Sequence, residues 1–160
     1  MRPSKDAYYL GIAEAVAQRS TCLRKRYGSV IVKDDEIIAT GYNGAPRGEP
    51  NCCDIGVCAR KDYTHGEGYL VCPAVHAEQN AIISAPRSEM IDSTLYLVGK
   101  EVSTGEYVKN ASSCAMCKRT IINAGIANVV VRDDKDNFRV IRVYDQWVLN
   151  DETLDMKLGY

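Results

Sequence analysis

Apolar residues recur at helical spacing in the first part of the chain, which predicts a helix over about residues 5–19. The apolar face of this helix would carry Tyr9, Ile12, Ala13, Val16 and Ala17. Two short runs rich in β-branched residues follow, at 28–33 and 36–40, and two aspartates separate them. Alternating runs split by a polar turn predict a β-hairpin.

The second half alternates between the two patterns. We predict helices where the apolar residues keep helical spacing and strands at the short β-branched runs. The predicted helices cover 75–85, 114–124 and, in the tail, 145–158, and the strands cover 93–98, 128–132 and 138–144. Pro86 and Gly125 would end the first two helices. Strands and helices in alternation after a hairpin indicate an α/β layered fold with a mixed sheet.

A long connection between these halves, at 41–73, lacks both patterns. It holds four of the seven cysteines and three of the five prolines, with much of the glycine. A loop of this length in a compact domain is usually functional, or something other than an apolar core holds it in place.

Length and charge narrow the class of protein. A chain of 160 residues is expected to form a single domain, 1–160. Its net charge of −1 argues against a polynucleotide partner. No apolar run has the length of a membrane span, and the N-terminus lacks the apolar stretch of a signal peptide. We therefore expect a cytoplasmic protein without a membrane or nucleic-acid partner, whose cysteines serve as thiols or metal ligands.

Four residues predict a catalytic zinc site. His76 and Glu78 form H-A-E at one predicted helix start, and Cys114 and Cys117 form C-A-M-C at another. H-x-E followed by P-C-x-x-C is the signature of zinc deaminases that act on nucleobases, and this chain matches it except at the proline. One histidine and two thiolates leave a fourth position of the zinc open for water. Glu78 would move the protons of the reaction.

Two other interpretations of these residues remain open. Cys114 and Cys117 alone could form a thioredoxin-like redox pair, although H-A-E then has no purpose. A zinc-stabilised nucleotide-binding protein without catalysis would need the metal ligands but not Glu78.

The chain also resembles the deoxycytidylate (dCMP) deaminases, within the cytidine deaminase superfamily. The resemblance covers about residues 15–132 and rests on S-T-C-L-R-K-R-Y-G-S-V-I-V, T-G-Y-N-G-A-P-R-G, H-A-E-Q-N-A-I and C-A-M-C-K-R-T-I-I-N-A-G-I. It implies a three-layer α/β/α sandwich with about five strands. It also implies hydrolytic, zinc-dependent deamination of dCMP to dUMP, which supplies the precursor of dTMP; related cytosine or purine compounds are alternative substrates.

The chain departs from the family pattern at two places. Ser113 stands where the family usually has proline before the first cysteine, and a serine could cap the helix instead. Family members often carry an aromatic residue beside the substrate after the V-V-V strand. This chain has D-D-K-D there, which leaves the exact nucleotide open.

The resemblance further implies a second, structural zinc, which some microbial members hold. The corresponding ligands here are Cys22, Cys52, His65 and Cys72, and Cys53 or Cys58 could replace one of them. Free thiols are the alternative for all of these cysteines.

The remaining expectations concern the nucleotide and the assembly. Asn43, in G-Y-N-G, could contact the sugar or simply form a turn. Arg26, from the basic run 24–26, is the preferred contact for the 5′-phosphate, with a solvated basic run as the alternative. The family implies a homo-oligomer, with a hexamer favoured. It also implies dCTP and dTTP as effectors, which could bind at 45–48.

Overall fold

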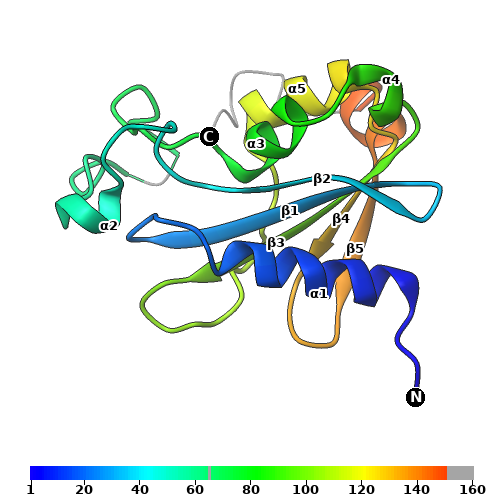
Figure 1. Ribbon diagram of the computed structural model, residues 1–160, viewed down its shortest axis with the longest axis horizontal. Coiled ribbons are helices and arrows are strands. Elements are labelled where there is room, and N and C mark those ends of the chain that lie inside the picture. The colour runs from blue at the N-terminus through cyan, green and yellow to red at the C-terminus, as the bar shows by residue number, and fades with distance from the viewer. Residues whose placement is uncertain (65, 151–160) are drawn as a thin grey trace.

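A five-stranded mixed sheet forms the centre of the computed structural model, which describes residues 1–64 and 66–150 (Figure 1). The strand order is β2-β1-β3-β4-β5. Strand β1 pairs antiparallel with β2 and β3, β3 pairs parallel with β4, and β4 pairs antiparallel with β5. The strands are β1 (Lys25–Lys33), β2 (Glu36–Tyr42), β3 (Thr94–Glu101), β4 (Asn128–Arg132) and β5 (Phe138–Arg142). The predicted hairpin and mixed sheet are both confirmed.

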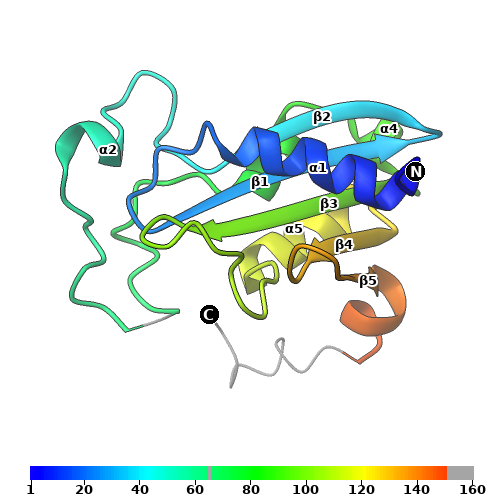
Figure 2. The same cartoon turned by 90° about the horizontal axis from the view of Figure 1, so that it is seen from below.

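Helices cover both faces of the sheet, as Figures 1 and 2 show. Helix α1 (Lys5–Ala17) lies across β1 and β3 on one face. The opposite face carries α3 (Ala77–Ile83), α4 (Arg87–Met90) and α5 (Ala115–Ala124). These are the three layers that the sequence predicted.

The two faces of the sheet enclose two separate apolar cores, because successive side chains of a strand point to opposite faces. Val30 and Val98 pack under α1 with Leu10, and all three are fully buried. Ile31 and Leu97 pack on the other face against α3 and α5. Strands buried on both sides account for the uninterrupted apolar runs in the sequence.

Two glycines set how closely the helices approach the sheet. A Cβ atom at Gly28 would lie 2.1 Å from Ala13 O, in α1. At Gly41 it would lie 2.3 Å from Ala77 O and 2.4 Å from Ala81 N, in α3. The helix backbones therefore rest directly on the backbones of β1 and β2.

Some elements differ from the sequence prediction. The irregular segment 41–73 contains a four-residue helix, α2 (Cys52–Ile55), and α4 is equally short. Neither has enough turns to show a helical pattern in the sequence. The predicted tail helix is a π-helical turn, η1 (Tyr144–Val148), that buries Trp147. The rest of that prediction, residues 151–158, lies outside the described residues.

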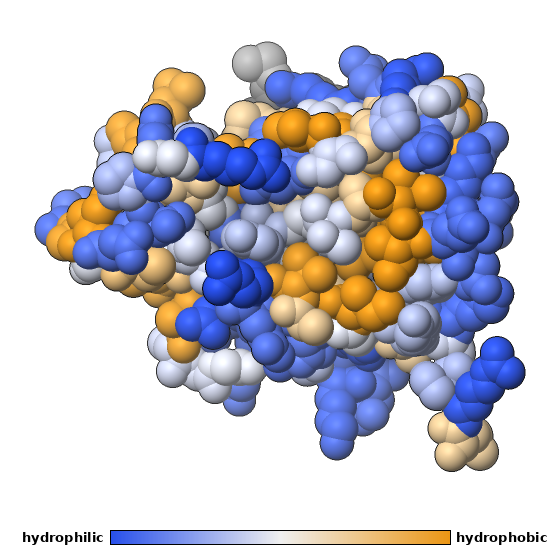
Figure 3. All heavy atoms as spheres, viewed as in Figure 1, coloured by the Kyte–Doolittle hydropathy of each residue, from blue (hydrophilic) through white to orange (hydrophobic). Residues whose placement is uncertain are grey.

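The face of Figure 1 carries apolar residues in more than one area. Figure 3 shows a broad one across the middle and right of this face, over β2 and α1, and smaller ones above it, with hydrophilic residues around them. Ile37 and Tyr42 are exposed on β2. Within the described part of the chain, no helix combines the length and the apolar character needed to cross a membrane.

Candidate metal centre and its pocket

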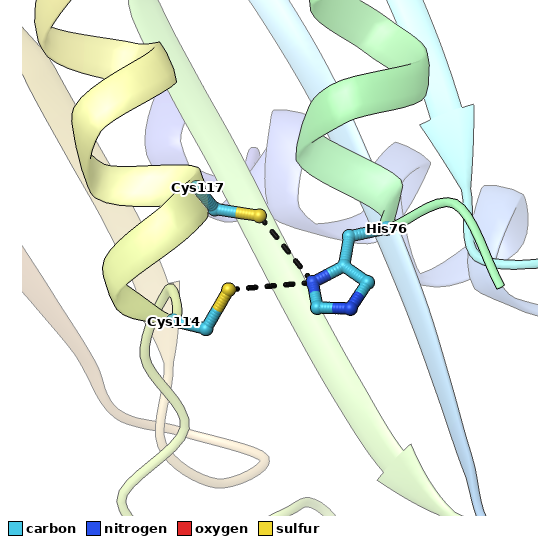
Figure 4. A group of neighbouring side chains, drawn as sticks. All are labelled: His76, Cys114 and Cys117. Carbon is cyan, nitrogen blue, oxygen red and sulfur yellow. Dashed lines mark hydrogen bonds between the residues drawn. The ribbon is translucent and has the colours of Figure 1, made fainter. Parts of the chain in front are cut away.

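Two helix starts bring the predicted zinc ligands together. His76 is the N-cap of α3, and Cys114 is the N-cap of α5. The Sγ atoms of Cys114 and Cys117 each lie 3.4 Å from Nδ1 of His76, and all three ligand atoms lie within 4.8 Å of one another (Figure 4). Residues 38 positions apart in the sequence thus converge between two neighbouring helices.

The donor set and its spacing fit zinc. Zinc bonded tetrahedrally to a histidine nitrogen at about 2.0–2.1 Å and to thiolate sulfurs at about 2.3 Å places these atoms roughly 3.5 Å apart. The observed separation of 3.4 Å between nitrogen and sulfur is close to that value. Three converging protein ligands are also the number that a catalytic zinc uses.

The two thiols differ in their readiness to ionise. A hydrogen bond from Cys117, and the neighbouring His76 ring, lower the pKa of Cys114 to about 4. The hydrogen bond to Cys114 and burial raise the pKa of Cys117. Burial acts to lower the pKa of His76, but its hydrogen bond with Cys114 outweighs burial and the net direction is upward. The lowered pKa favours the thiolate form of Cys114 beside the His76 ring, and a thiolate is the form of cysteine that binds a metal.

Glu78 lies in the first turn of α3, two residues after His76, and is almost fully buried. Burial, and after it the negative charge of Cys114, raise the pKa of the Glu78 carboxyl group. A carboxyl group whose pKa is raised toward the working pH can both accept and donate a proton. Glu78 thus lies next to the candidate metal ligands, with its carboxyl group buried and its pKa raised.

Ser113 does not cap helix α5, contrary to the expectation from the sequence. The N-cap is Cys114, and no side chain caps this helix start. The hydroxyl of Ser113 is buried and has no hydrogen-bond partner among the described residues.

The metal ligands and Glu78 line a pocket of about 310 Å³. Glu78 is the only carboxylate among its lining residues in the described part of the chain, whereas five cations line it. These cations are Arg24, Lys25, Arg60, Lys109 and Lys118. The pocket is therefore suited to a small anion, although the chain as a whole carries a charge of only −1.

The structure does not bring Arg26 to this pocket. Lys25 and Tyr27 line it, and neighbouring side chains of a strand point to opposite faces, so Arg26 is exposed on the far side of β1. The basic run does reach the pocket, but through Arg24 and Lys25.

Asn43 lines the pocket and also joins it to the sheet. Its Nδ2 atom donates to Lys25 O at 2.9 Å, and its Oδ1 atom accepts from Tyr27 N at 2.8 Å. One N–H and one lone pair of the amide are left for other contacts. These two hydrogen bonds from the Asn43 side chain fix the backbone of β1 at the edge of the pocket.

The other cysteines cluster without forming a complete site. Burial, and after it the charges of Cys22, Cys72, Cys58 and Cys53, raise the pKa of Cys52, and Cys22, Cys58 and Cys72 line the same pocket. Among the described residues, only the set around His76 has three ligand atoms within 4.8 Å of one another. His65, the fourth predicted ligand, lies outside the described residues. The A-P-R-G segment 45–48 does not line the pocket.

Sequence reasoning missed several residues of the pocket wall. Arg60 and Tyr69 come from the irregular segment 41–73, and Lys109 comes from the connection that precedes α5. Tyr27 is in β1, and Lys118 directly follows Cys117. No motif or spacing marks these positions, because the chain path through the irregular loops determines which of their side chains reach the pocket.

Known proteins resemble this chain over most of its length. The deoxycytidylate deaminase of Saccharomyces cerevisiae is 35% identical over 147 residues, which cover 89% of this chain and 43% of that protein. The deoxycytidylate deaminase of Mycobacterium phage D29 is 39% identical over 138 residues, which cover 81% of this chain and 94% of that protein. This chain thus spans less than half of the yeast relative and nearly all of the phage relative.

A solved structure and a family model complete the comparison. The dCMP deaminase of cyanophage S-TIM5, in complex with dCMP and dUMP, superimposes with a TM-score of 0.58 at 28% identity. The match covers 83% of this chain and 84% of that one. Residues 3–133 match the model of the cytidine and deoxycytidylate deaminase zinc-binding region. The chain therefore belongs to the cytidine and deoxycytidylate deaminase family.

Proposed function

We propose that this chain is a zinc-dependent dCMP deaminase, which converts dCMP and water to dUMP and ammonia and so supplies the precursor of dTMP. The observation that carries the proposal is the convergence of His76, Cys114 and Cys117 beside the buried carboxyl group of Glu78. The relatives named above and the complex of the cyanophage enzyme with dCMP and dUMP support this substrate. The proposal treats residues 1–160 as a single deaminase-type domain, and a cytoplasmic location stays a prediction.

Glu78 performs the proton transfers in this proposal. Zinc, when bound by the three ligands, lowers the pKa of water toward about 7. Glu78 accepts one proton from the attacking water and delivers it to the ring nitrogen N3; it then accepts the proton of the hydroxyl group newly added at C4 and delivers it to the leaving amino group. The buried position of Glu78 restricts proton exchange with solvent during these steps.

The decisive experiment is an ammonia-release assay with dCMP, CMP, deoxycytidine and dCTP. We expect dCMP to be the best substrate, and Glu78→Gln to lose at least about 100-fold in kcat, the usual contribution of a general acid–base. Glu49→Gln, which changes an exposed carboxylate, is the control. Activity that persists in Glu78→Gln would overturn the mechanism. A zinc-loaded wild-type chain that releases no ammonia from any of the four would favour the non-catalytic alternative.

We assign the binding of the 5′-phosphate of dCMP to the cations that line the pocket. Among them Arg24 is the preferred contact, in place of Arg26, which the sequence alone favoured. Arg24 lines the pocket, whereas Arg26 faces the other side of β1. Arg24→Gln should raise KM for dCMP about tenfold or more, since a charge-assisted contact is lost. It should leave KM for deoxycytidine within about twofold. Arg26→Gln is the matched control, and equal effects of the two substitutions on dCMP would remove the assignment.

A second, structural zinc held by Cys22, Cys52 and Cys72 is part of the proposal, with His65 or Cys58 as the fourth ligand. The clustering of these thiols around Cys52 supports it. Metal analysis should find two zinc ions per chain and one in Cys52→Ser. Cys53→Ser, at an exposed thiol, should keep both. One zinc in the wild type would exclude the second site.

The proposal also retains the family expectations of a homo-oligomer, with a hexamer favoured, and of dCTP and dTTP as effectors. Light scattering would give the oligomeric state. Initial rates with dCMP, measured with and without each effector, would test the regulation. Rates that do not respond to either nucleotide would exclude it.

A further inference from the structure

The pocket has few aromatic side chains that could contact a flat base. Tyr27 and Tyr69 are the aromatic residues among its lining residues in the described part of the chain, apart from the metal ligand His76. The turn after β4, where relatives often carry an aromatic residue, is polar here and does not line the pocket. Asp134 closes this turn with hydrogen bonds from Asn137.

Tyr69 stands next to the metal ligands. Its ring centroid lies 5.5 Å from that of His76, with 55° between the ring planes. The guanidinium group of Arg60 lies over the Tyr69 ring, 4.1 Å from its centroid. Arg60 is itself tied to the loop, because its Nε atom donates to Glu67 O at 2.8 Å. A cation and a hydrogen bond thus fix the orientation of the Tyr69 ring at the pocket wall.

Tyr27 has a different position. It packs with the apolar core under α3 and α5, and its ring covers Gly99 so closely that a Cβ atom there would lie 2.4 Å from a ring carbon. Its backbone N–H is bound to Asn43. Both tyrosines are partly buried, but Tyr27 packs against the core at the base of the pocket, whereas Tyr69 comes from the loop that walls it.

We propose that Tyr69 is the residue that packs against the pyrimidine ring of the substrate, and that Arg60, which lies over the Tyr69 ring, is a positioning residue that fixes its orientation. This inference rests on the proposed function, since it concerns the same pocket. A base whose reacting carbon lies at the metal site must approach the His76 ring, and Tyr69 is the aromatic ring in contact with His76. Aromatic stacking tolerates different bases. Contact with Tyr69 would therefore raise the affinity for the nucleotide without distinguishing cytosine from uracil.

The test compares the affinities of zinc-loaded variants for two ligands by calorimetry. One ligand is dUMP, and the other is deoxyribose 5-phosphate, which lacks the base. Tyr69→Ala should weaken dUMP binding about tenfold or more and leave deoxyribose 5-phosphate binding within about twofold. Tyr69→Phe keeps the ring and should bind dUMP within about threefold of the wild type. A Phe variant as weak as the Ala variant would overturn the proposal, and so would unchanged dUMP affinity in Tyr69→Ala.

Metal analysis of Tyr69→Ala separates contact with the base from support of His76. We expect its zinc content to equal that of the wild type, and loss of zinc would overturn the proposal in favour of a structural role. If the wild type releases ammonia from dCMP while Tyr69→Ala binds dUMP normally, only this inference fails. If the wild type releases no ammonia from dCMP, the proposed function itself fails.

A double-mutant cycle tests Arg60. If Arg60 acts through Tyr69, Arg60→Gln should weaken dUMP binding severalfold in the wild type and have almost no effect in the Tyr69→Ala background. Deoxyribose 5-phosphate binding should not change in either background. Weaker binding of this base-free ligand would show that Arg60 contacts the phosphate instead, and additive effects on dUMP would also exclude the positioning role.

Discussion

The hydroxyl group of Ser29 in β1 donates a hydrogen bond to the carbonyl oxygen of Ala77, the first residue of α3, at 2.8 Å. Both residues are completely inaccessible to solvent. Ala77 lies between the candidate metal ligand His76 and Glu78, so this bond fixes the helix start that presents both side chains. The sheet thereby supports the candidate metal centre through Ser29, a side chain that does not itself line the pocket.

Ser29→Ala should therefore lower stability and metal affinity together. We expect a loss of about 0.5–1.5 kcal/mol in the free energy of unfolding, the usual net value of a hydrogen bond. Zinc should also dissociate faster, because the N-terminus of α3 gains freedom. Denaturant titration and stopped-flow zinc release measure the two effects. Ser103→Ala, at an exposed site, is the control, and equal behaviour of the two variants would contradict this role of Ser29.

Gly41→Ala should push α3 away from the sheet. The new Cβ atom would meet backbone atoms of Ala77 and Ala81, which cannot rotate away. We expect a loss of about 1–3 kcal/mol or more in the free energy of unfolding, together with weaker zinc binding. Gly11→Ala is the matched control, because no atom lies within 4 Å of its Cβ position on an exposed part of α1. That substitution should stabilise by about 0.5–1 kcal/mol.

Ser113→Ala should not destabilise the chain, because the hydroxyl that it removes is buried without a partner. Removal of an unsatisfied buried polar group is neutral or stabilises by up to about 1 kcal/mol. Thermal unfolding of this variant and of the exposed control Ser112→Ala tests the point. A loss of more than about 1 kcal/mol in Ser113→Ala alone would mean that the hydroxyl has a partner in solution, and Glu78 is its nearest candidate.

Glu14 should stabilise the fold only while it is ionised. Burial acts to raise the pKa of Glu14, but hydrogen bonds from Lys100 and Tyr107 outweigh it and hold the pKa below its usual value of 4.5. Because the unfolded chain then binds the proton more readily, stability from this group is present above that value and is lost as the pH falls through the folded pKa.

The comparison of Glu14→Gln with the wild type measures this effect. The wild type should be more stable by about 1 kcal/mol at pH 7, and the difference should shrink below about pH 5. Glu106→Gln, at an exposed carboxylate, should show no such trend. A difference between the wild type and Glu14→Gln that is the same at pH 7 and pH 3.5 would contradict the prediction.

The sequence predicts the metal ligands and the layers better than the rest of the pocket. His76 and Cys114 are recognisable because the chemistry demands fixed residue types at helix starts, and local patterns give those starts. The strands of the mixed sheet are recognisable because burial on both faces leaves continuous apolar runs.

The residues around the nucleotide are harder to predict. Arg24 and Arg26 are equally basic, but Arg26 lies within β1 and faces away from the pocket, whereas Arg24 precedes the strand and reaches the pocket from the connection before it. Arg60 and Tyr69 reach the pocket through a loop whose path no local pattern encodes. The sequence alone suggests that Asn43 is a turn residue or a sugar contact. In the structure its side-chain amide forms hydrogen bonds with the backbone of β1, as a neighbouring strand would.

The position of the metal ligands at the starts of α3 and α5 has a consequence for every stability measurement on this chain. An ion held by His76, Cys114 and Cys117 would bridge the starts of two helices, α3 and α5, which α4 and β3 separate in the sequence. Zinc that binds the folded chain more tightly than the unfolded one adds to stability in proportion to the logarithm of its free concentration. Unfolding energies of variants are therefore comparable only in buffers that fix free zinc, and the concentration of the ion becomes a thermodynamic variable as important as temperature or pH.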